Sequence, residues 1–462
     1  MIGLYKYKKR KDVNLRTFFV YVFTLILFYS FFFSMYAIDR GNLIESMVIT
    51  EHRLDVFVNK HFKKKYLNDD FFVEYQDDID LTKLDRSLLI LPFIMNVFST
   101  ICISGDTYYI DTIDADTYRS LQNLNNLYKV LFPRTTWNGK LIAKNVVINR
   151  PENKKIEQNK DHIAIMFSGG LDSVHTSLMH EAGKQLLITA WGQPDLKWYQ
   201  LERWQRAKQL FQSFASQRNQ THTFFRSNHH TFLNYTVLDN LTPEIKRWWM
   251  YAILGPCWAG LAAPIVVTHG YSILFVSSAV TWDYPYLYGT CPVVDDAICF
   301  AGIKLRHYGF DKTRTQKCDD IQKQCKVNDI SLPILRICPG FDYTNCCLCE
   351  KCMRTMAEIL VSGGDLVSFG FNIDRTYAVA RIKKNFVYDL ILKGKKNYTS
   401  VWFCQQIQKN LESRFSSHKE ELSDLKWLLD INFEPIAKQK SKTKIKVNWR
   451  KLYKETEYSR CV

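Results

Sequence analysis

Charged residues make up only 23% of this 462-residue chain, a share too small for a largely disordered protein. Hydrophobic residues reach 47%, so the chain can bury a substantial core. Its length is sufficient for two or three domains. From residue 376 to the end we find no repeat, no low-complexity block and no chemical motif, only a basic sequence with helical character.

Acidic residues are too few to balance the basic ones, which leaves a net charge of +16. The excess is uneven, because basic residues crowd the first sixteen positions and the stretch Lys438–Arg460. Such ends suit nucleic acid, anionic lipid or another polyanion, and tRNA is one partner of this kind. Basic ends that simply face solvent are an equal alternative. The charge therefore does not select the substrate.

No charge interrupts the 22 residues Thr17–Ile38, which are rich in Phe, Tyr, Leu and Val. This run is long enough to cross a bilayer and directly follows a basic stub. A cleaved signal peptide would have a shorter apolar core and a small-x-small site, which Met35-Tyr36-Ala37 does not supply. The run predicts an uncleaved signal anchor and a single-pass membrane protein. A buried helix of a globular domain is the alternative.

The side of the membrane that holds the rest of the chain stays open. The positive-inside rule places the amino terminus in the cytosol and the remainder on the far side. Sequons of the Asn-x-Ser/Thr type carry little weight, because a chain with this much Asn, Ser and Thr yields several by chance. They lie at Asn219, Asn234, Asn240 and Asn397. The thirteen cysteines fit either compartment.

The most informative motif is an apolar strand that runs into the loop Ser168-Gly169-Gly170-Leu171-Asp172-Ser173, called the Ser168 loop below. Glycines let backbone N–H groups approach an anion, hydroxyl groups donate further hydrogen bonds, and a following helix turns its positive end to the charge. We expect that helix over 174–182, with Gly183 as its stop. The motif predicts a phosphate-binding loop, and an ordinary Gly-Ser turn is the alternative.

This Ser-Gly-Gly-x-Asp-Ser sequence resembles the PP-loop of the N-type ATP pyrophosphatases, a superfamily that splits ATP into AMP and pyrophosphate. The Gly-Lys-Ser/Thr ending of a Walker loop is absent. The resemblance implies that Ser168, Gly169, Gly170, Leu171, Asp172 and Ser173 bind ATP, with Asp172 and Ser173 also catalytic. It implies Mg²⁺ with the nucleotide, for which Asp172 is the protein-side partner. The backbone after the second strand would hold adenine, which points to Ala190–Gly192 and so to Trp191.

Strand and helix patterns alternate from His162 onward, which predicts a parallel sheet with right-handed crossovers. We expect strands over 162–167, 186–191, 223–226 and 272–278, and helices over 199–218 and 243–262. Because ligands bind beyond the carboxyl ends of such strands, Ser168, Trp191 and Ser277-Ser278 should share one rim. Earlier in the chain, strands over 71–75, 88–91 and 107–110 and a helix over 118–131 predict an α+β region.

The fold class that follows is α/β, with a doubly wound parallel sheet of the PP-loop (HUP) type. An α+β amino-terminal domain, one amino-terminal transmembrane helix and a helical, basic carboxyl-terminal region complete it. We place the boundaries at 1–40 for the basic stub and anchor, 41–155 for the accessory domain, 156–375 for the PP-loop domain and 376–462 for the tail.

A second motif, with the spacing C-x7-C-x2-C-x2-C, comprises Cys338, Cys346, Cys349 and Cys352, and leaves Cys347 over. Four thiolates on short loops can close a tetrahedral shell, so the spacing predicts structural zinc. An iron–sulfur cluster and disulfides are the alternatives. The pattern is similar to the four-cysteine zinc site of 7-cyano-7-deazaguanine synthases, a branch of the same superfamily, and an arginine, Arg354, follows here too.

Between the two motifs, Lys317 best matches the lysine by which family members reach the leaving pyrophosphate. Arg314 lies one turn before it on the same helix face and is a substrate-binding candidate. Preorganised cations would stabilise the charge that builds on pyrophosphate. Asp295 is a second substrate candidate, with a loop turn as the alternative. For Arg314 and Lys317 the alternative is a solvated helix face.

The chain departs from 7-cyano-7-deazaguanine synthases in its length, its anchor and its lack of a Gly-Arg-Asn element before the third helix, so the deazapurine substrate is not implied. A glutaminase domain would need an amino-terminal cysteine nucleophile, and none is evident in the sequence. The leading hypothesis is an adenylating enzyme, a C–N ligase that activates a carboxylate or amide of a small molecule. The alternatives are a thiolase-like tRNA-modifying enzyme, with Cys347 as a spare thiol, and a non-catalytic, membrane-tethered nucleotide-binding protein.

Overall fold

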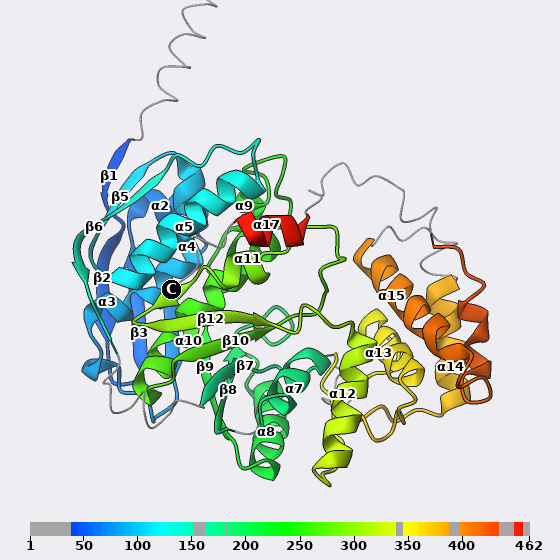
Figure 1. The fold of residues 1–462 in the computed structure, drawn as a ribbon. Helices are drawn as coiled ribbons and strands as arrows, with labels where there is room; N and C mark the ends of the chain where they lie inside the picture. The colour runs from blue at the N-terminus through cyan, green and yellow to red at the C-terminus, as the bar shows by residue number, and fades with distance from the viewer. Residues whose placement is uncertain are drawn as a thin grey trace, which may run out of the picture.

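A nine-stranded sheet runs through the protein (Figure 1). The computed structural model of the protein describes residues 38–150, 162–181, 183–338, 345–387, 398–433 and 448–455. The strand order is β11-β12-β10-β7-β8-β9-β4-β3-β2. The five strands from β12 to β9 are parallel, whereas β4, β3 and β2 at one edge and β11 at the other are antiparallel to their neighbours. The bounds are β2 Ile44–Ile49, β3 Arg53–Val58, β4 Phe71–Tyr75, β7 Ile163–Met166, β8 Gln185–Trp191, β9 Thr221–Ser227, β10 Ile273–Ser277, β11 Cys299–Phe300 and β12 Ile303–Tyr308.

The parallel strands form a doubly wound arrangement. In chain order β7, β8 and β9 extend the sheet in one direction, and the chain then returns to add β10 and β12 on the other side of β7. The strand order therefore reverses between β7 and β10, and ligands of open α/β sheets bind outside the carboxyl ends of the strands at such a point. The predicted α/β class with a parallel sheet is confirmed, and the Ser168 loop directly follows β7.

Alternate residues of the central strands face two separate cores, as the two-residue period of a strand requires. Ile165 and Leu187 pack with α7 (Leu171–Leu178), α8 (Leu201–Gln217) and α12 (Arg314–Val327), which Figure 1 shows on one side of the sheet. Ala164 and Leu186 pack into the core of α4 (Leu91–Ser104) and α10 (Leu254–His269). Burial on both faces explains why every residue of β8 is buried.

The segment predicted as an accessory domain contributes to this same sheet through β2, β3 and β4. It also forms a three-stranded parallel sheet of β1 (Asp39–Asn42), β5 (Thr107–Asp114) and β6 (Lys140–Val147). The hydroxyl of Tyr128 donates to the Ala252 carbonyl at 2.8 Å, and that of Tyr75 to the Leu261 carbonyl at 3.0 Å. The segments on the two sides of the predicted boundary near residue 156 therefore contribute strands to the same sheet. The helices of this part are α2 Lys60–Tyr66, η1 Leu81–Lys83, α3 Arg86–Leu89, α4 and α5 Ala115–Leu131.

The prediction of a strand over 88–91 was wrong, because α3 and α4 occupy these positions. The side chain of Asp85 accepts from the Ser87 N–H at 2.8 Å and caps α3, and Pro92 lies in the first turn of α4. A short apolar run cannot be told from a fully buried helix by its period alone. The helix expected over 243–262 begins only at η2 (Trp249–Ile253), which leads into α10.

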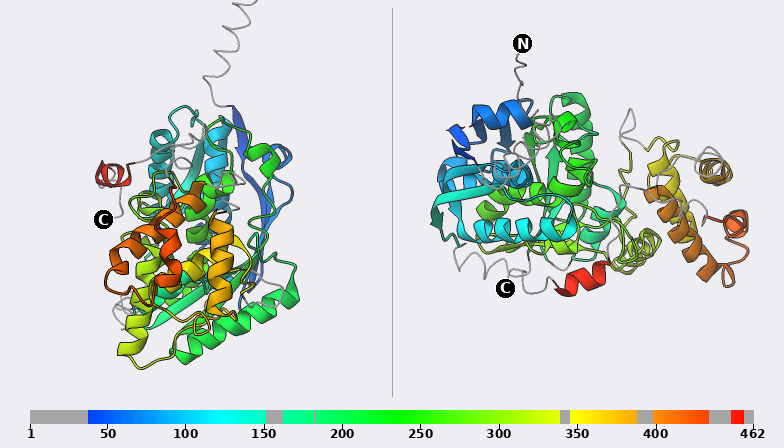
Figure 2. Two further views of the ribbon diagram at one scale, coloured as in Figure 1. Left: turned by 90° about the vertical axis from the view of Figure 1, so that its right-hand side faces the viewer. Right: turned by 90° about the horizontal axis from the view of Figure 1, so that it is seen from above.

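The region after β12 is helical. It comprises α12, α13 (Glu350–Val361), α14 (Arg375–Lys383), α15 (Tyr398–Phe415) and η4 (Ser423–Leu428), and Figure 2 shows the last three as a separate layer on α13. The short helix α17 (Trp449–Glu455) returns to α11 (Pro292–Asp295). The remaining short helix, α9, spans Tyr235–Leu238.

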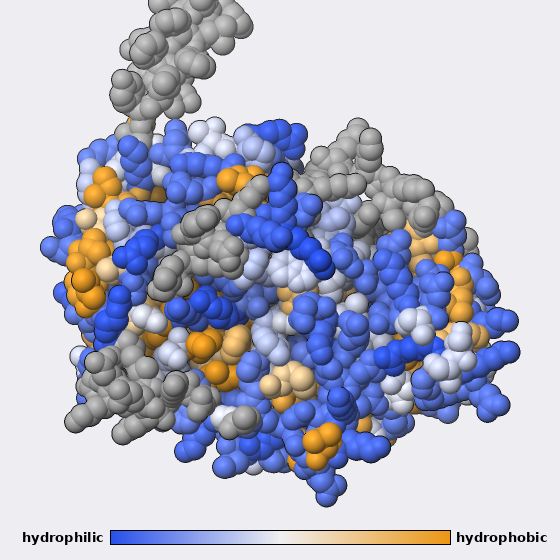
Figure 3. All heavy atoms as spheres, in the orientation of Figure 1, coloured by the Kyte–Doolittle hydropathy of each residue, from blue (hydrophilic) through white to orange (hydrophobic). Residues whose placement is uncertain are grey.

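The predicted membrane anchor lies outside the described residues, apart from Ile38. Among the described residues one helix, Trp249–His269, is long and apolar enough to cross a membrane, but it lies mid-chain and 78% of its most apolar stretch is buried. Its residues pack in the core around α4, as expected of a core helix in an α/β protein. The face of the molecule seen in Figure 3 is mainly hydrophilic, interrupted by small apolar patches.

Candidate functional site

The loop after β7 has a backbone that only glycine can adopt without strain. Gly169 has φ +70°, in the left-handed region. A Cβ atom at this position would lie 2.9 Å from Cε1 of Phe211, closer than real contacts allow. The carbonyl of Gly169 accepts a hydrogen bond from the Arg336 N–H at 2.7 Å. The loop is therefore held between α8, which carries Phe211, and the segment before Cys338.

Two serine hydroxyl groups close the loop onto the start of α7. The Ser168 N–H donates to Oγ of Ser173 at 3.2 Å, and the hydroxyl of Ser173 donates to the Gly170 carbonyl at 3.1 Å. Gly170 is the N-cap of α7, and no side chain in the described part of the chain caps it. The N–H groups of the first turn are left for a ligand, with the positive end of the helix dipole behind them.

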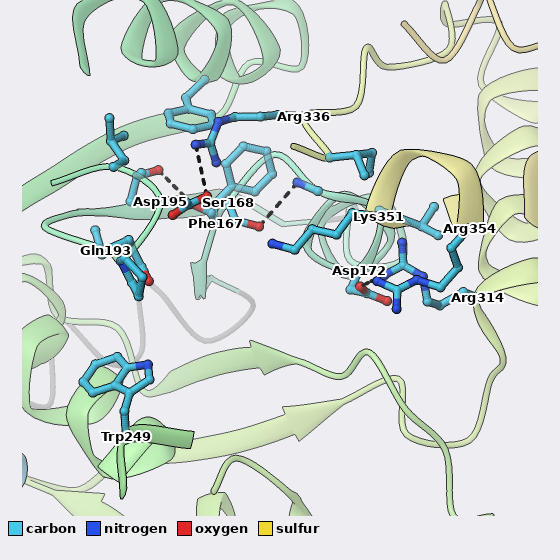
Figure 4. A pocket seen from close by; sticks show the side chains of 18 of the residues that line it. Phe167, Ser168, Asp172, Gln193, Asp195, Trp249, Arg314, Arg336, Lys351 and Arg354 are labelled. Atoms are coloured by element: carbon cyan, nitrogen blue, oxygen red, sulfur yellow. Dashed lines mark hydrogen bonds and ion pairs between the residues drawn. The ribbon is translucent and has the colours of Figure 1, made fainter. Parts of the chain in front are cut away.

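A cavity of about 440 Å³ opens beside this loop, at the carboxyl ends of β7 and β8. Its size lies within the ~300–1,000 Å³ usual for small-molecule sites. Figure 4 shows the charged side chains gathered at one side of it and Trp249 at another. Residues from several separate parts of the chain line it: Phe167, Ser168, Gly170, Leu171, Asp172, Thr189, Ala190, Gln193, Pro194, Asp195, Leu196, Phe211, Trp249, Tyr288, Arg314, Arg336, Ile337, Lys351 and Arg354.

The cavity wall carries more positive than negative charge. Its cationic residues are Arg314, Arg336, Lys351 and Arg354, and its carboxylates are Asp172 and Asp195. Arg336 lies 3.5 Å from the Asp195 carboxylate, and Arg354 lies 3.3 Å from Glu350 on its own helix. No salt bridge found in the described residues involves Lys351, and Figure 4 shows its side chain directed toward Ser168. The arrangement suits a ligand with several negative charges.

Asp172 lies between two buried cations. Its Oδ2 accepts from the guanidinium of Arg314, and its Oδ1 lies 3.2 Å from Nζ of Lys317. Burial raises the pKa of Asp172, but the two positive charges outweigh this effect and bring the pKa below its usual value. Burial also lowers the pKa of Lys317, although Asp172 opposes the shift. The Lys317 ammonium donates in addition to the Ser278 carbonyl, so it joins the ends of β7 and β10 behind the loop.

Arg314 is fixed from the opposite side by helix α13. Its Nε lies 2.9 Å from Oε2 of Glu358, and its NH2 group donates to Oγ1 of Thr355 at 2.9 Å. Burial disfavours the charged guanidinium, yet the carboxylates of Asp172 and Glu358 raise the pKa of Arg314 above its usual value. Burial raises the pKa of Glu358 despite the neighbouring Arg314 charge. The chain Glu358–Arg314–Asp172 thus links α13, α12 and α7.

The structure brings some of the sequence-predicted site residues to the cavity and leaves others outside its lining. Ser168, Gly170, Leu171, Asp172 and Arg314 line it, and Gly169 and Ser173 belong to the same loop. Three others do not line it: Lys317, Trp191 and Asp295. The side chain of Lys317 is 1% exposed.

Trp191 and Asp295 are held in the interior. The indole N–H of Trp191 donates to the Lys197 carbonyl at 2.9 Å, and its ring stacks on Trp204 at 5.1 Å. The cavity wall at the end of β8 is formed instead by Thr189 and Ala190. Asp295 accepts a hydrogen bond from Thr290 at 2.6 Å and pairs with His307 at 2.8 Å, and burial raises its pKa.

Sequence reasoning did not assign three of the four cavity cations to the site. Arg336 precedes the first motif cysteine by two residues, while Lys351 and Arg354 flank the last one. The spacing of Lys351 and Arg354 could have indicated two of these three cations, because it places both on one face of α13, one turn apart. Trp249 was missed because it opens η2, far from both motifs in the sequence, and no local pattern marks it.

The four motif cysteines form a compact group that can hold a metal ion such as zinc. Their sulfur atoms all lie within 4.8 Å of one another, and those of Cys346 and Cys352 are 3.9 Å apart. A tetrahedral zinc site with Zn–S bonds of about 2.3 Å places its sulfurs about 3.8 Å apart. All four are free thiols rather than disulfides. The predicted ligand set is thus brought together.

Backbone N–H groups turn toward these sulfurs. The Cys349 N–H donates to Sγ of Cys346 at 3.3 Å, and the Cys346 N–H donates to Sγ of Cys338 at 3.3 Å. Such bonds favour the thiolate form that binds a metal. Cys347 does not join the group, because its thiol donates to the Asn345 carbonyl at 3.4 Å. Burial raises the pKa of Cys347 to about 11.

Comparisons of the chain with protein-family models, with curated proteins and with solved structures find no match.

Proposed function

We propose that the protein is an adenylating enzyme of the PP-loop type, which splits ATP into AMP and pyrophosphate and activates a carboxylate or amide for attack by a nitrogen nucleophile. The observation that carries the proposal is the cavity at the switch point of the sheet. There the Ser168 loop and the start of α7 face a wall that bears four cationic side chains. A triphosphate is a ligand that uses both the N–H groups at the start of α7 and the cationic side chains of the wall.

In this proposal the loop holds the phosphates and the cations of the wall stabilise the departing pyrophosphate. Cleavage at the α-phosphate builds negative charge, and fixed cations lower the barrier because they need no reorganisation. Lys351 and Arg354 would take this role, since they line the cavity, whereas Arg314 is already bound by Asp172, Glu358 and Thr355. Lys317 acts through Asp172, because its ammonium is buried behind that carboxylate. The adenine would lie against the backbone of Thr189 and Ala190 at the end of β8.

The residues present fit zinc better than they fit a protein-bound Mg²⁺ ion. Both carboxylate oxygens of Asp172 are engaged, Oδ2 by Arg314 and Oδ1 by Lys317. Asp172 therefore offers no unengaged oxygen to a cation. Magnesium commonly binds through substrate phosphates and water, with few protein ligands. The four cysteines, by contrast, supply the complete tetrahedral set that structural zinc requires.

The environment of Cys347 favours adenylation over the tRNA-thiolase alternative. A thiolase needs a reactive thiol to carry sulfur, and the thiolate is the reactive form. Cys347 is buried, its thiol donates to the Asn345 carbonyl, and it is not among the residues that line the cavity. The single-pass membrane location stays part of the proposal on the strength of the apolar run Thr17–Ile38.

The experiment that tests the proposal measures AMP and pyrophosphate together after the protein is mixed with ATP, Mg²⁺ and a library of carboxylates and amides. We expect equal amounts of the two products with an accepted substrate. Ser173→Ala should lower the rate by about 10²-fold, because it removes a hydroxyl of the loop. Ser216→Ala, on the exposed surface of α8, is the matched control. A protein that binds ATP but releases neither product would support the non-catalytic alternative instead.

A further inference from the structure

Three of the four cavity cations are neighbours in sequence of the four-cysteine group. Arg336 lies two residues before Cys338, and Lys351 and Arg354 lie one before and two after Cys352. All three line the cavity. A backbone fixed at a cysteine leaves little freedom to a residue one or two positions away, because each residue has only two soft dihedral angles. The positions of these cations thus depend on the four-cysteine group.

The segment before Cys338 is tied to both the Ser168 loop and the cysteine group. The Arg336 N–H donates to the Gly169 carbonyl at 2.7 Å. Next to it, the Ile337 N–H donates to Oδ1 of Asn345 at 2.9 Å, and Nδ2 of Asn345 donates to the Leu335 carbonyl at 2.8 Å. Asn345 directly precedes Cys346 and is buried. The Asn345 side chain and the backbone of residues 335–337 thus connect the cysteine group to Gly169.

Helix α13 makes a second connection. Its N-cap is Cys349, whose sulfur accepts from the Cys352 N–H at 3.5 Å. The same helix carries Thr355 and Glu358, which hold Arg314 on the floor of the cavity. The start of α13 is thus fixed at the cysteine group, and its next turns position the cation that binds Asp172.

We infer that metal bound at the four cysteines positions the cations of the cavity, so that metal and a polyanionic ligand bind with linked affinities. The identity of that ligand as ATP rests on the proposed function, whereas the linkage requires only a polyanion. Loss of the metal would leave the four sulfurs without the ion that they bind in common. The segment before Cys338 and the start of α13 would then no longer be held together by that ion. Linkage is reciprocal for binding free energies, so a polyanion in the cavity must also raise the affinity of the four cysteines for the metal.

The test uses the full chain loaded with Zn²⁺ or Co²⁺, with ATP and inorganic pyrophosphate as separate probes. Metal transfer to a coloured chelator is followed to equilibrium with and without each probe, and the affinity of each probe is measured by calorimetry before and after metal removal. We expect a saturating probe to raise the affinity for the metal about five-fold or more, the lower end of usual coupling between sites. The thiolate-to-cobalt absorption should also shift when pyrophosphate binds.

Two variants separate positioning from general stability. Lys351→Met should bind its metal with the wild-type affinity in the absence of probe, yet lose the gain in metal affinity that the probes give. Cys347→Ser should retain both the metal and the gain in metal affinity, because Cys347 is not one of the four ligands. If metal-free protein unfolds, the cobalt absorption of the folded, metal-loaded protein with and without pyrophosphate still decides the matter.

The outcomes distinguish the two claims. A gain in metal affinity with pyrophosphate, without any ATP binding, would support the linkage and count against the proposed function. ATP binding with equal affinity before and after metal removal, and without effect on metal transfer, would overturn the linkage and leave the proposed function standing. Binding of neither probe to the metal-loaded protein would overturn both.

Discussion

The guanidinium of Arg314 binds the carboxylate of Asp172 at the floor of the cavity, across 142 positions of sequence. One residue opens α12 and the other lies in the first turn of α7. The ion pair thus joins the loop that follows β7 to the helices that follow β12. Because the buried Glu358 holds the same guanidinium from α13, the charge of Arg314 is shared by two carboxylates.

Replacement of Arg314 should destabilise the fold as well as the site. Arg314→Ala leaves Glu358 buried without its cation and leaves Asp172 with Lys317 alone, and breaking such a pair costs about 3–5 kcal/mol. Urea unfolding of the wild type and the variant measures the difference. Arg119→Ala is the matched control, because the Arg119 side chain is 72% exposed and should change stability by less than about 0.5 kcal/mol. Equal losses for the two variants would contradict the role given to Arg314.

The two glycines of the loop should respond differently to alanine. Gly169→Ala forces a Cβ atom into the Phe211 ring at a positive φ, which costs on the order of 1–3 kcal/mol. Gly170 has φ −80°, and a Cβ there would meet its nearest atoms only at 3.4 Å, so Gly170→Ala should be tolerated by the fold. Thermal unfolding compares the two variants, and a Gly170→Ala protein less stable than Gly169→Ala would count against the loop geometry.

His229 should make stability depend on pH in a defined direction. Its ring lies among Phe225, Trp249 and Trp258, and neither ring nitrogen has a hydrogen-bond partner in the described residues. Burial lowers the pKa of His229 to about 3, so the unfolded state binds more protons than the folded state between pH 6.5 and pH 3. The contribution of the neutral ring is fully present above pH 6.5 and is lost as the pH falls through this window, by at most about 1.4 kcal/mol per pH unit.

Urea unfolding from pH 7 to pH 5 should therefore show a shallower decline for His229→Phe than for the wild type. At pH 7 the variant should be as stable as the wild type or more so, because an apolar ring of similar shape removes an unsatisfied buried polar group. The control is His175→Phe, which should destabilise at pH 7 because it removes the 2.9 Å contact with Asp320. An identical pH slope for His229→Phe and the wild type would contradict the buried, neutral ring.

Removal of one motif cysteine should release the metal, whereas removal of its neighbour should not. Cys352→Ser takes away one of four ligands, and metal analysis of the purified variant should show less than one zinc per chain. Cys347→Ser should keep the wild-type zinc content, because its sulfur donates to the Asn345 carbonyl instead. Iron and acid-labile sulfide in place of zinc would favour the cluster alternative.

Deletion of residues 1–37 should detach the protein from membranes without unfolding it. The first described strand begins at Asp39, so the two sheets keep all their strands. We expect the full chain to sediment with membranes after a carbonate wash and the shortened chain to stay in the supernatant with an unchanged unfolding midpoint. Membrane association of the shortened chain would contradict an anchor over Thr17–Ile38.

Local patterns in the sequence determined the Ser168 loop, the four cysteines and the alternation of strands and helices. A strand that ends in Ser168-Gly169-Gly170 and four cysteines at short spacing are encoded within a few residues, so they can be read without the fold. Tertiary structure alone decided that Arg336, Lys351 and Arg354 line the cavity, that Lys317 is buried behind Asp172, and that β2 to β4 extend the main sheet. These facts depend on contacts between residues far apart in the chain, which no local period contains. Such contacts also explain why the apolar run at 88–91 is helical and buried instead of forming the predicted strand.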